Sequence, residues 1–300
     1  MTLRRSLFAA LALASLAACT TTTPPKPEVA TKPLPKLRIG VALGGGAAKG
    51  FAHVGVLKML EAQGLTPVVV SGTSAGSVVG SLYAAGYTPF ELQEKSFALD
   101  EDSIRDLSLG GGGLVKGEKL QDYVNKLVSN RPIEKLSKPF AAVATNLDTG
   151  KRTAFVRGNT GQAVRASSSI PSIFQPVQIG NQRYVDGGVV SPVPVDAARD
   201  LGADFVIAVD ISTKPEQGKG ADGMVSILNQ TITIMGRQLG EQELARADFV
   251  IRPRVGRIGP ADFDQKHIAI LEGEKATQAA LPAIKQKIEQ KMRELAAKNP

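Results

Sequence analysis

The chain has 300 residues, of which 43% are hydrophobic and 21% are charged, and its formal net charge at pH 7 is +8. This composition suits a globular protein with a substantial core, while the 5% aromatic content and the absence of a basic block argue against a nucleic-acid-binding protein. A single cysteine excludes an intrachain disulfide.

Residues 1–18 have the composition of an export signal. Arg4 and Arg5 precede an apolar run that is too short to span a bilayer. Cys19 follows, and the four residues LAAC resemble the lipobox at which bacterial lipoprotein precursors are diacylated and cleaved. The sequence therefore predicts a lipid anchor on Cys19 and a place in the bacterial cell envelope, at the outer membrane and facing the periplasm because Thr20 replaces an aspartate. An ordinary cleavage site with an incidental cysteine is the alternative.

Residues 19–36 contain five prolines and four successive threonines, so we expect an extended tether rather than part of a core. Residues 37–300 are long enough for one large domain, and no second proline-rich linker divides them. Their net positive charge suits contact with an anionic membrane surface, but a solvated surface of mixed charge explains it equally well.

Strand-length apolar runs alternate with amphipathic stretches of helical length throughout the domain. This alternation predicts an α/β fold with a mainly parallel sheet and helices on both faces. The run LGGGGL, residues 109–114, is either a flap over a site or a plain flexible loop. The predicted strands are 38–43, 67–70, 140–146, 152–156, 183–186, 204–210 and 248–252, and the predicted helices are 50–63, 75–86, 89–98, 117–129, 161–168, 193–201, 223–240 and 264–296.

The first strand ends in a glycine-rich turn that opens a helix. Such a turn directs unpaired backbone amides outward, where they bind phosphate or stabilise an oxyanion. A phosphate-binding P-loop needs Ser or Thr after its Gly-Lys pair, whereas here Lys49 precedes Gly50 and Phe51. The pattern therefore favours an oxyanion hole over a nucleotide site, with the amides of Gly45 and Gly46 as donors.

The next strand leads into GTSAG, residues 72–76, and then into a helical stretch. A serine between a strand and a helix, flanked by Gly72 and Gly76, is typical of a nucleophile elbow, which exposes the hydroxyl of Ser74 on a strained turn. A glycine-rich structural turn is the alternative. Further along, Asp186 ends a short strand and precedes two glycines, a pairing that alone indicates a hairpin turn.

Together, the glycine turn, GxSxG and DGG resemble the patatin-like phospholipase family, specifically its bacterial single-domain members, over about residues 37–212. The segment SSSIPSIFQPV, residues 167–177, is similar to the helix and proline turn that these proteins carry before DGG. The resemblance implies a three-layer α/β/α sandwich and lipid-ester substrates. It also implies a Ser–Asp dyad of Ser74 and Asp186.

The same resemblance implies roles for the residues of the glycine turn. Gly45 and Gly46 correspond to the oxyanion donors, and Lys49 stands where the family has arginine or lysine, as a possible contact of the turn or of a lipid phosphate. A solvated lysine at a helix start is the equal alternative. Ala47 stands where many members have a third glycine, which affects the shape of the hole.

Only His53 and His267 are available for a Ser–Asp–His triad. His267 follows Asp186 in the order that an α/β-hydrolase requires, but we expect it on the surface of a late helix. We expect His53 to be packed at a helix start, so the dyad is favoured over the triad.

These features predict a serine acylhydrolase that cleaves phospholipids, lysophospholipids or related esters without a cofactor or metal. Two alternatives stay open: an enzyme for soluble esters or thioesters with the same dyad, and a catalytically silent lipid-binding lipoprotein. The sequence does not predict the oligomeric state.

Overall fold

The structure, a computed structural model, describes residues 36–100, 104, 106–107, 115–212 and 223–298, without the side chains of 224–226 and 229. The chain divides into the units Met1–Leu34 and Pro35–Pro300, and the described residues belong to the second. The predicted export signal, Cys19, nearly all of the tether and the glycine run 109–114 lie outside the described residues.

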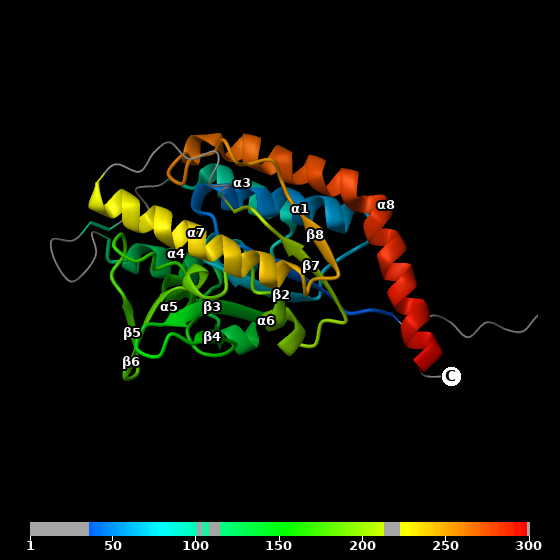
Figure 1. The fold of residues 1–300 in the computed structure, drawn as a ribbon, viewed down its shortest axis with the longest axis horizontal. Coiled ribbons are helices and arrows are strands. Elements are labelled where there is room, and N and C mark those ends of the chain that lie inside the picture. The colour runs from blue at the N-terminus through cyan, green and yellow to red at the C-terminus, as the bar shows by residue number, and fades with distance from the viewer. Residues whose placement is uncertain (1–35, 101–103, 105, 108–114, 213–222, 299–300) are drawn as a thin grey trace, which may run out of the picture. The chain divides into compact units, whose positions relative to one another are not determined.

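A mixed sheet runs through the centre of the domain (Figure 1). Its order is β5-β6-β3-β2-β1-β7-β8, and β4 also pairs with β3. The central pairs are parallel, whereas the pairs β3–β4, β3–β6 and β5–β6 are antiparallel. The strands are β1 (Ile39–Leu43), β2 (Val69–Thr73), β3 (Phe140–Asn146), β4 (Arg152–Phe155), β5 (Val177–Ile179), β6 (Gln182–Asp186), β7 (Phe205–Val209) and β8 (Phe249–Ile251).

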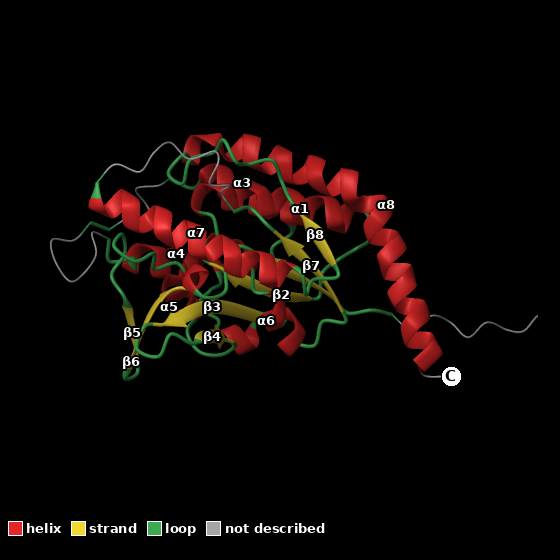
Figure 2. Cartoon of the chain, in the orientation of Figure 1, coloured by secondary structure: helices red, strands yellow, loops and turns green. Residues whose placement is uncertain are grey.

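Helices cover both faces of the sheet and give the three-layer sandwich that was predicted (Figure 2). On one face α1, α2, α4 and α5 pack with α3 and α8, and on the other α6 packs on the strands beside α7. The helices are α1 (Ala52–Ala62), α2 (Ala75–Ala84), α3 (Pro89–Ala98), α4 (Glu118–Leu127), α5 (Thr160–Ser167), α6 (Val195–Asp200), α7 (Met224–Leu244) and α8 (Lys266–Lys298), and a 3₁₀ turn, η1 (Ala47–Phe51), precedes α1. None of the described helices is long and apolar enough to cross a bilayer.

The alternating side chains of β1 divide the core between these layers. Val41 and Leu43 belong to the large cluster under α1, α2 and α8, whereas Ala42 packs with Val195 of α6 and Leu244 of α7. Because both faces of β1 and β7 are buried, these two strands are apolar throughout, as expected of a parallel sheet.

Two strands differ from the prediction. The second was expected at 67–70, ending before the polar Ser71, but β2 continues to Thr73. The hydroxyl of Ser71 donates to the carbonyl of Pro194 at 2.8 Å, and that of Thr73 donates to Ser191 at 2.8 Å, so both polar side chains are satisfied inside the sheet. The short β5, of three residues, was not predicted.

The two strands that lead to the predicted site meet end to end on β3. β4 pairs with residues 142–145, which overlap both the part of β3 that pairs with β2 and the part that pairs with β6. A strand has two edges, so β2 and β6 share the edge opposite β4. Thr73 at the end of β2 lies opposite Val143, and Asp186 at the end of β6 lies opposite Ala144. The topology therefore brings Ser74 and Asp186 to one point of the sheet.

Close backbone contact between α1 and α8 provides a test of the packing. A Cβ atom added to Gly273 would lie 2.1 Å from the carbonyl oxygen of Ala52, whereas one added to Gly240 of α7 would meet its nearest atom at 3.4 Å. We expect Gly273→Ala to lower the free energy of unfolding by about 2 kcal/mol or more because the two helices must separate. Gly240→Ala, the matched control, should leave it unchanged or raise it by up to about 1 kcal/mol. Urea denaturation of both variants measures the difference, and equal stabilities would contradict this packing.

Candidate active site

Ser74 occupies the sharp turn between β2 and α2. Its backbone has φ 54° and ψ −126°, a conformation that a residue with a Cβ rarely adopts, and it costs on the order of 1–3 kcal/mol. The side chain is 6% exposed. The strained turn matches the prediction of an elbow rather than a relaxed loop.

The two glycines of GTSAG allow this turn to form. A Cβ on Gly72 would lie 2.3 Å from the carbonyl oxygen of Gly76, and a Cβ on Gly76 would lie 2.1 Å from the carbonyl oxygen of Leu43. A side chain at Gly72 would therefore push the start of α2 away from β2, and one at Gly76 would push it away from β1.

Ser167 at the end of α5 holds the elbow from outside. The amide of Ser74 donates to the Ser167 hydroxyl at 2.9 Å, and that hydroxyl donates to the carbonyl of Val143 at 2.6 Å. Since Val143 is also the last partner of β2 on β3, this relay fixes the height of Ser74 above the sheet. The sequence indicated the segment SSSIP without this role.

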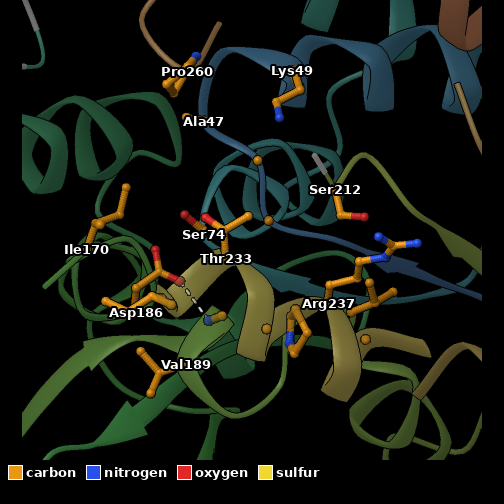
Figure 3. A pocket seen from close by; sticks show the side chains of 18 of the residues that line it. Ala47, Lys49, Ser74, Ile170, Asp186, Val189, Ser212, Thr233, Arg237 and Pro260 are labelled. Atoms are coloured by element: carbon orange, nitrogen blue, oxygen red, sulfur yellow. Dashed lines mark hydrogen bonds between the residues drawn. The ribbon is translucent and has the colours of Figure 1, made fainter. Parts of the chain in front are cut away.

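Asp186 is 5% exposed at the end of β6. Its Oδ1 accepts the amide of Gly188 at 2.7 Å. Within the described residues, no donor meets both the distance and the angle of a hydrogen bond to its Oδ2. Burial raises the pKa of Asp186 to about 6, and the Ser74 hydroxyl and the Gly188 amide oppose this rise. Figure 3 shows the side chains of Ser74 and Asp186 directed into the same cavity. The structure thus offers a buried carboxylate oxygen beside a serine hydroxyl.

The two glycines after Asp186 form a 3₁₀ turn, not a hairpin. A Cβ on Gly187 would lie 2.1 Å from the carbonyl oxygen of Val143 and 3.0 Å from the Thr73 side chain. Glycine therefore lets β6 end directly against β2.

Residues 191–194 tie the parts of the site together through their carbonyls. The carbonyl of Ser191 accepts the Thr73 hydroxyl, and that of Pro192 accepts the amide of Gly45 at 3.0 Å. The nucleophile strand, the glycine turn and the segment that follows Asp186 consequently share one hydrogen-bonded junction.

Glu243 of α7 holds this junction from the other side. Its Oε1 accepts the Ser191 hydroxyl at 2.5 Å and its Oε2 accepts the amide of Val193 at 2.8 Å. Burial raises the pKa of Glu243 to about 7, against the lowering effect of these hydrogen bonds and of Arg246. The sequence did not predict this residue, because it lies beyond the predicted helix 223–240 and its partners are about 50 residues away.

The glycine turn requires a correction to the predicted oxyanion donors. The amide of Gly45 is engaged by Pro192, so in this structure it does not point toward Ser74 as a free donor. The amides of Gly46 and Ala47 have no hydrogen bond recorded among the described residues, and both residues line the cavity with Ser74. Ala47 adopts φ 50°, the left-handed region that glycine enters without strain, so the alanine keeps a glycine-like turn.

Lys49 is 3% exposed and lines the same cavity, which rules out the solvated lysine considered from the sequence. Burial lowers its pKa, and the nearby carboxylate of Asp210 partly offsets this effect. Figure 3 shows its ammonium group reaching toward the cavity from η1.

Neither histidine lines the cavity that contains Ser74 and Asp186. His53 is fully buried, and its Nε2 lies 2.8 Å from the carbonyl oxygen of Gly44, so Nε2 carries the proton. Burial lowers the pKa of His53 to about 4. His267 is exposed at the start of α8. Both positions agree with the roles predicted for these residues, packing for His53 and surface for His267.

Two cavities meet at Ser74. One, of about 310 Å³, contains Asp186 and polar and charged side chains (Figure 3), and the other, of about 270 Å³, lies between α2, α4 and the segment after α5. In the first, Asp210 and Glu241 both pair with Arg252, at 3.2 and 3.5 Å. The second is almost wholly apolar and includes Val78, Val79, Leu120, Phe174 and Phe263. Among the described residues, no group of His, Cys, Asp and Glu side chains is arranged to hold a metal.

A sequence profile described as patatin-like phospholipase matches residues 41–199, from β1 into α6. The chain belongs to the patatin-like phospholipase family. An uncharacterized NTE family protein of Mycobacterium tuberculosis is 34% identical over 67% of this chain and 56% of its own length. A protein of Emericella nidulans named lysophospholipase nte1 is 32% identical over 64% of this chain and 13% of its own. The match thus spans about half or less of these relatives.

The patatin-like fold is also present in VipD from Legionella pneumophila. Its crystal structure aligns with a TM-score of 0.60 and 15% identity, over 83% of this chain and 67% of that chain. Ser74, Asp186 and the glycine turn all fall inside the patatin-like segment, whereas α7, with Glu243, lies beyond it.

The buried carboxyl of Glu243 makes the stability of the domain depend on pH. The folded protein holds the Glu243 proton up to about pH 7, while an unfolded chain releases it near pH 4. This contribution to stability is therefore complete below about pH 4 and is lost as the pH rises through 7. We expect Glu243→Gln to have a lower free energy of unfolding than the wild type at pH 5. This difference should narrow by on the order of 1–3 kcal/mol toward pH 8. Denaturant titrations at several pH values measure the gap.

The exposed Glu289 provides the control, because its replacement by glutamine should leave the pH dependence unchanged. A gap between Glu243→Gln and the wild type that stays constant from pH 5 to pH 8 would contradict the proposed protonation of Glu243.

Proposed function

We propose that the protein is a lipid acylhydrolase that uses a Ser–Asp dyad. The observation that carries this proposal is the position of Ser74, on a strained elbow beside the buried carboxyl of Asp186, where two cavities meet, one with charged side chains in its lining and one almost wholly apolar. Family membership and the name of the fungal relative, lysophospholipase, support a lipid ester as substrate.

In the acylation step, the Oγ of Ser74 attacks the ester carbonyl carbon, and Oδ2 of Asp186 takes the serine proton. An ordinary aspartate is a weak base, but burial brings the pKa of Asp186 to about 6 and so closer to the working pH. The C–O bond to the alcohol then breaks, and the alcohol oxygen takes the proton from Asp186. Water then attacks the acyl-serine and gives a proton to Asp186. The bond between the acyl carbon and the Ser74 Oγ breaks, and that oxygen takes the proton back from Asp186.

The developing oxyanion needs donors that are already in place. The amides of Gly46 and Ala47 lie at the start of η1 and α1, where unpaired N–H groups and the helix dipole favour negative charge. Each such donor typically lowers the barrier by about 3 kcal/mol. The tie between Gly45 and Pro192 keeps the turn in this position.

The two cavities suggest how the substrate lies. The acyl chain occupies the apolar cavity beside Val78 and Val79, because an alkyl chain loses water contact there without leaving polar groups unpaired. The alcohol part, with its headgroup, occupies the cavity that contains Lys49 and Arg237. Lys49 contacts the turn or a lipid phosphate.

Hydrolysis of esters at several pH values tests the dyad. Wild type should cleave p-nitrophenyl butyrate and lysophosphatidylcholine, with kcat/KM rising as the pH rises through about 6, because Asp186 must lose its proton to act as a base. Ser74→Ala should abolish turnover, and Asp186→Asn should reduce it by about 10²-fold or more at every pH. Ser137→Ala changes an exposed serine whose hydroxyl donates to the backbone carbonyl of Ala85, and it serves as the matched control.

The outcomes separate the alternatives. Turnover of the soluble ester without turnover of lysophosphatidylcholine would favour the soluble-ester or thioester enzyme. An inactive wild type would favour a silent lipid-binding protein. Full turnover by Asp186→Asn would refute the dyad.

A further inference from the structure

Helix α7 exposes a row of large apolar side chains. Ile227 is 55% exposed, Leu228 44%, Ile234 52% and Met235 60%. The two pairs are seven residues apart, which is close to two helical turns, so they lie on one face of the helix. We call these four residues the α7 surface.

The opposite face of α7 lines the cavity that contains Asp186. Its residues there include Thr233, Gly236, Arg237 and Gly240, and their helical positions point about 180° away from the α7 surface. One helix therefore separates the cavity of Ser74 from an exposed apolar face by about its own diameter, on the order of 10 Å.

The charge of this helix is unusual for an exposed one. Residues 224–240 contain no Asp, Glu or Lys, and their single charged residue is Arg237. Thr231 and Gln238, which share the exposed face, are neutral, and acidic residues appear only from Glu241 onward. A helix face that is apolar and carries no negative charge suits contact with an anionic lipid surface, whereas a helix face exposed to water usually carries charged side chains.

We propose that the α7 surface rests in the interfacial layer of a lipid bilayer and so presents the cavity of Ser74 to membrane lipid. This inference rests on the proposed function, because the substrate of that site would then come from the surface on which α7 lies. Amphipathic helices bind in this way, with the apolar face about 5–10 Å deep at the headgroup boundary. The patatin-like segment ends before α7, so family membership does not assign this face.

Tryptophan fluorescence gives a direct test because the chain contains no tryptophan. Met235→Trp in the full chain places a single fluorophore on the α7 surface. Vesicles made from equal parts of ether-linked phosphatidylcholine and phosphatidylglycerol should shift its emission to shorter wavelength. Val68→Trp is the control, because Val68 is 39% exposed just before β2, at the end of that strand opposite Ser74, and its emission should not shift.

A second variant tests the contribution of the face to binding. Ile234→Ser with Met235→Ser should bind the same vesicles about tenfold or more weakly. It should keep the wild-type turnover of p-nitrophenyl butyrate, a monomeric ester, and this shows that the variant is folded. Lysophosphatidylcholine presented in vesicles should be cleaved more slowly.

Two results would overturn the proposal. In one, the emission of Met235→Trp does not respond to vesicles or responds no more than that of Val68→Trp. In the other, the shift occurs without vesicles and grows with protein concentration, which would place a second copy of the chain on this face. Ether lipids have no ester to cleave, so the fluorescence measurement does not depend on catalysis. An enzyme that binds vesicles but cleaves no ester would refute the proposed function and leave the vesicle-binding result unchanged.

Discussion

The end-to-end meeting of β2 and β6 on one edge of β3 is the constraint on which the site depends. Thr73 and Asp186 end these strands opposite neighbouring residues of β3, so the next residue after β2, Ser74, emerges beside the carboxylate. Two strands can approach in this way only if no side chain lies between them, and Gly187 meets that condition. The same crowding buries Asp186 and raises its pKa, and so the geometry that places the aspartate also makes it a better base.

A junction built in this way needs partners for its buried polar groups, and residues 191–194 supply them. Their carbonyls accept from Thr73, Gly45 and Ser71, and Glu243 accepts the hydroxyl of Ser191 from the far side. Among the described residues Glu243 forms no hydrogen bond with Ser74 or Asp186. It binds Ser191, whose carbonyl accepts the hydroxyl of Thr73, the residue before Ser74. Helix α7 therefore lines the cavity that contains Asp186, binds residues 191–193 through Glu243, and carries the proposed membrane surface.

The local patterns of the sequence were sufficient to predict the layers and most elements. Alternating apolar runs located the strands, and GTSAG located the elbow, because a strained turn between a strand and a helix requires glycines at fixed positions. Contacts between distant segments were not predictable. The predicted strand ended before the polar Ser71, because the partners of Ser71 and Thr73 lie about 120 residues away. Glu243 was not predicted, because its partners lie about 50 residues away. The glycine-turn pattern predicts an oxyanion donor at Gly45, but its amide bonds Pro192, a contact that forms only in the tertiary fold.

The central claim is that an acyl group is carried on Ser74 with its chain in the apolar cavity. A crystal structure of the full chain after reaction with a long-chain alkyl fluorophosphonate tests this most directly. We predict a bond from phosphorus to the Ser74 Oγ, the phosphonyl oxygen at the amides of Gly46 and Ala47, and the alkyl chain beside Val78 and Val79. A bond to another residue, or an alkyl chain that lies in the cavity of Lys49 and Arg237, would contradict the account.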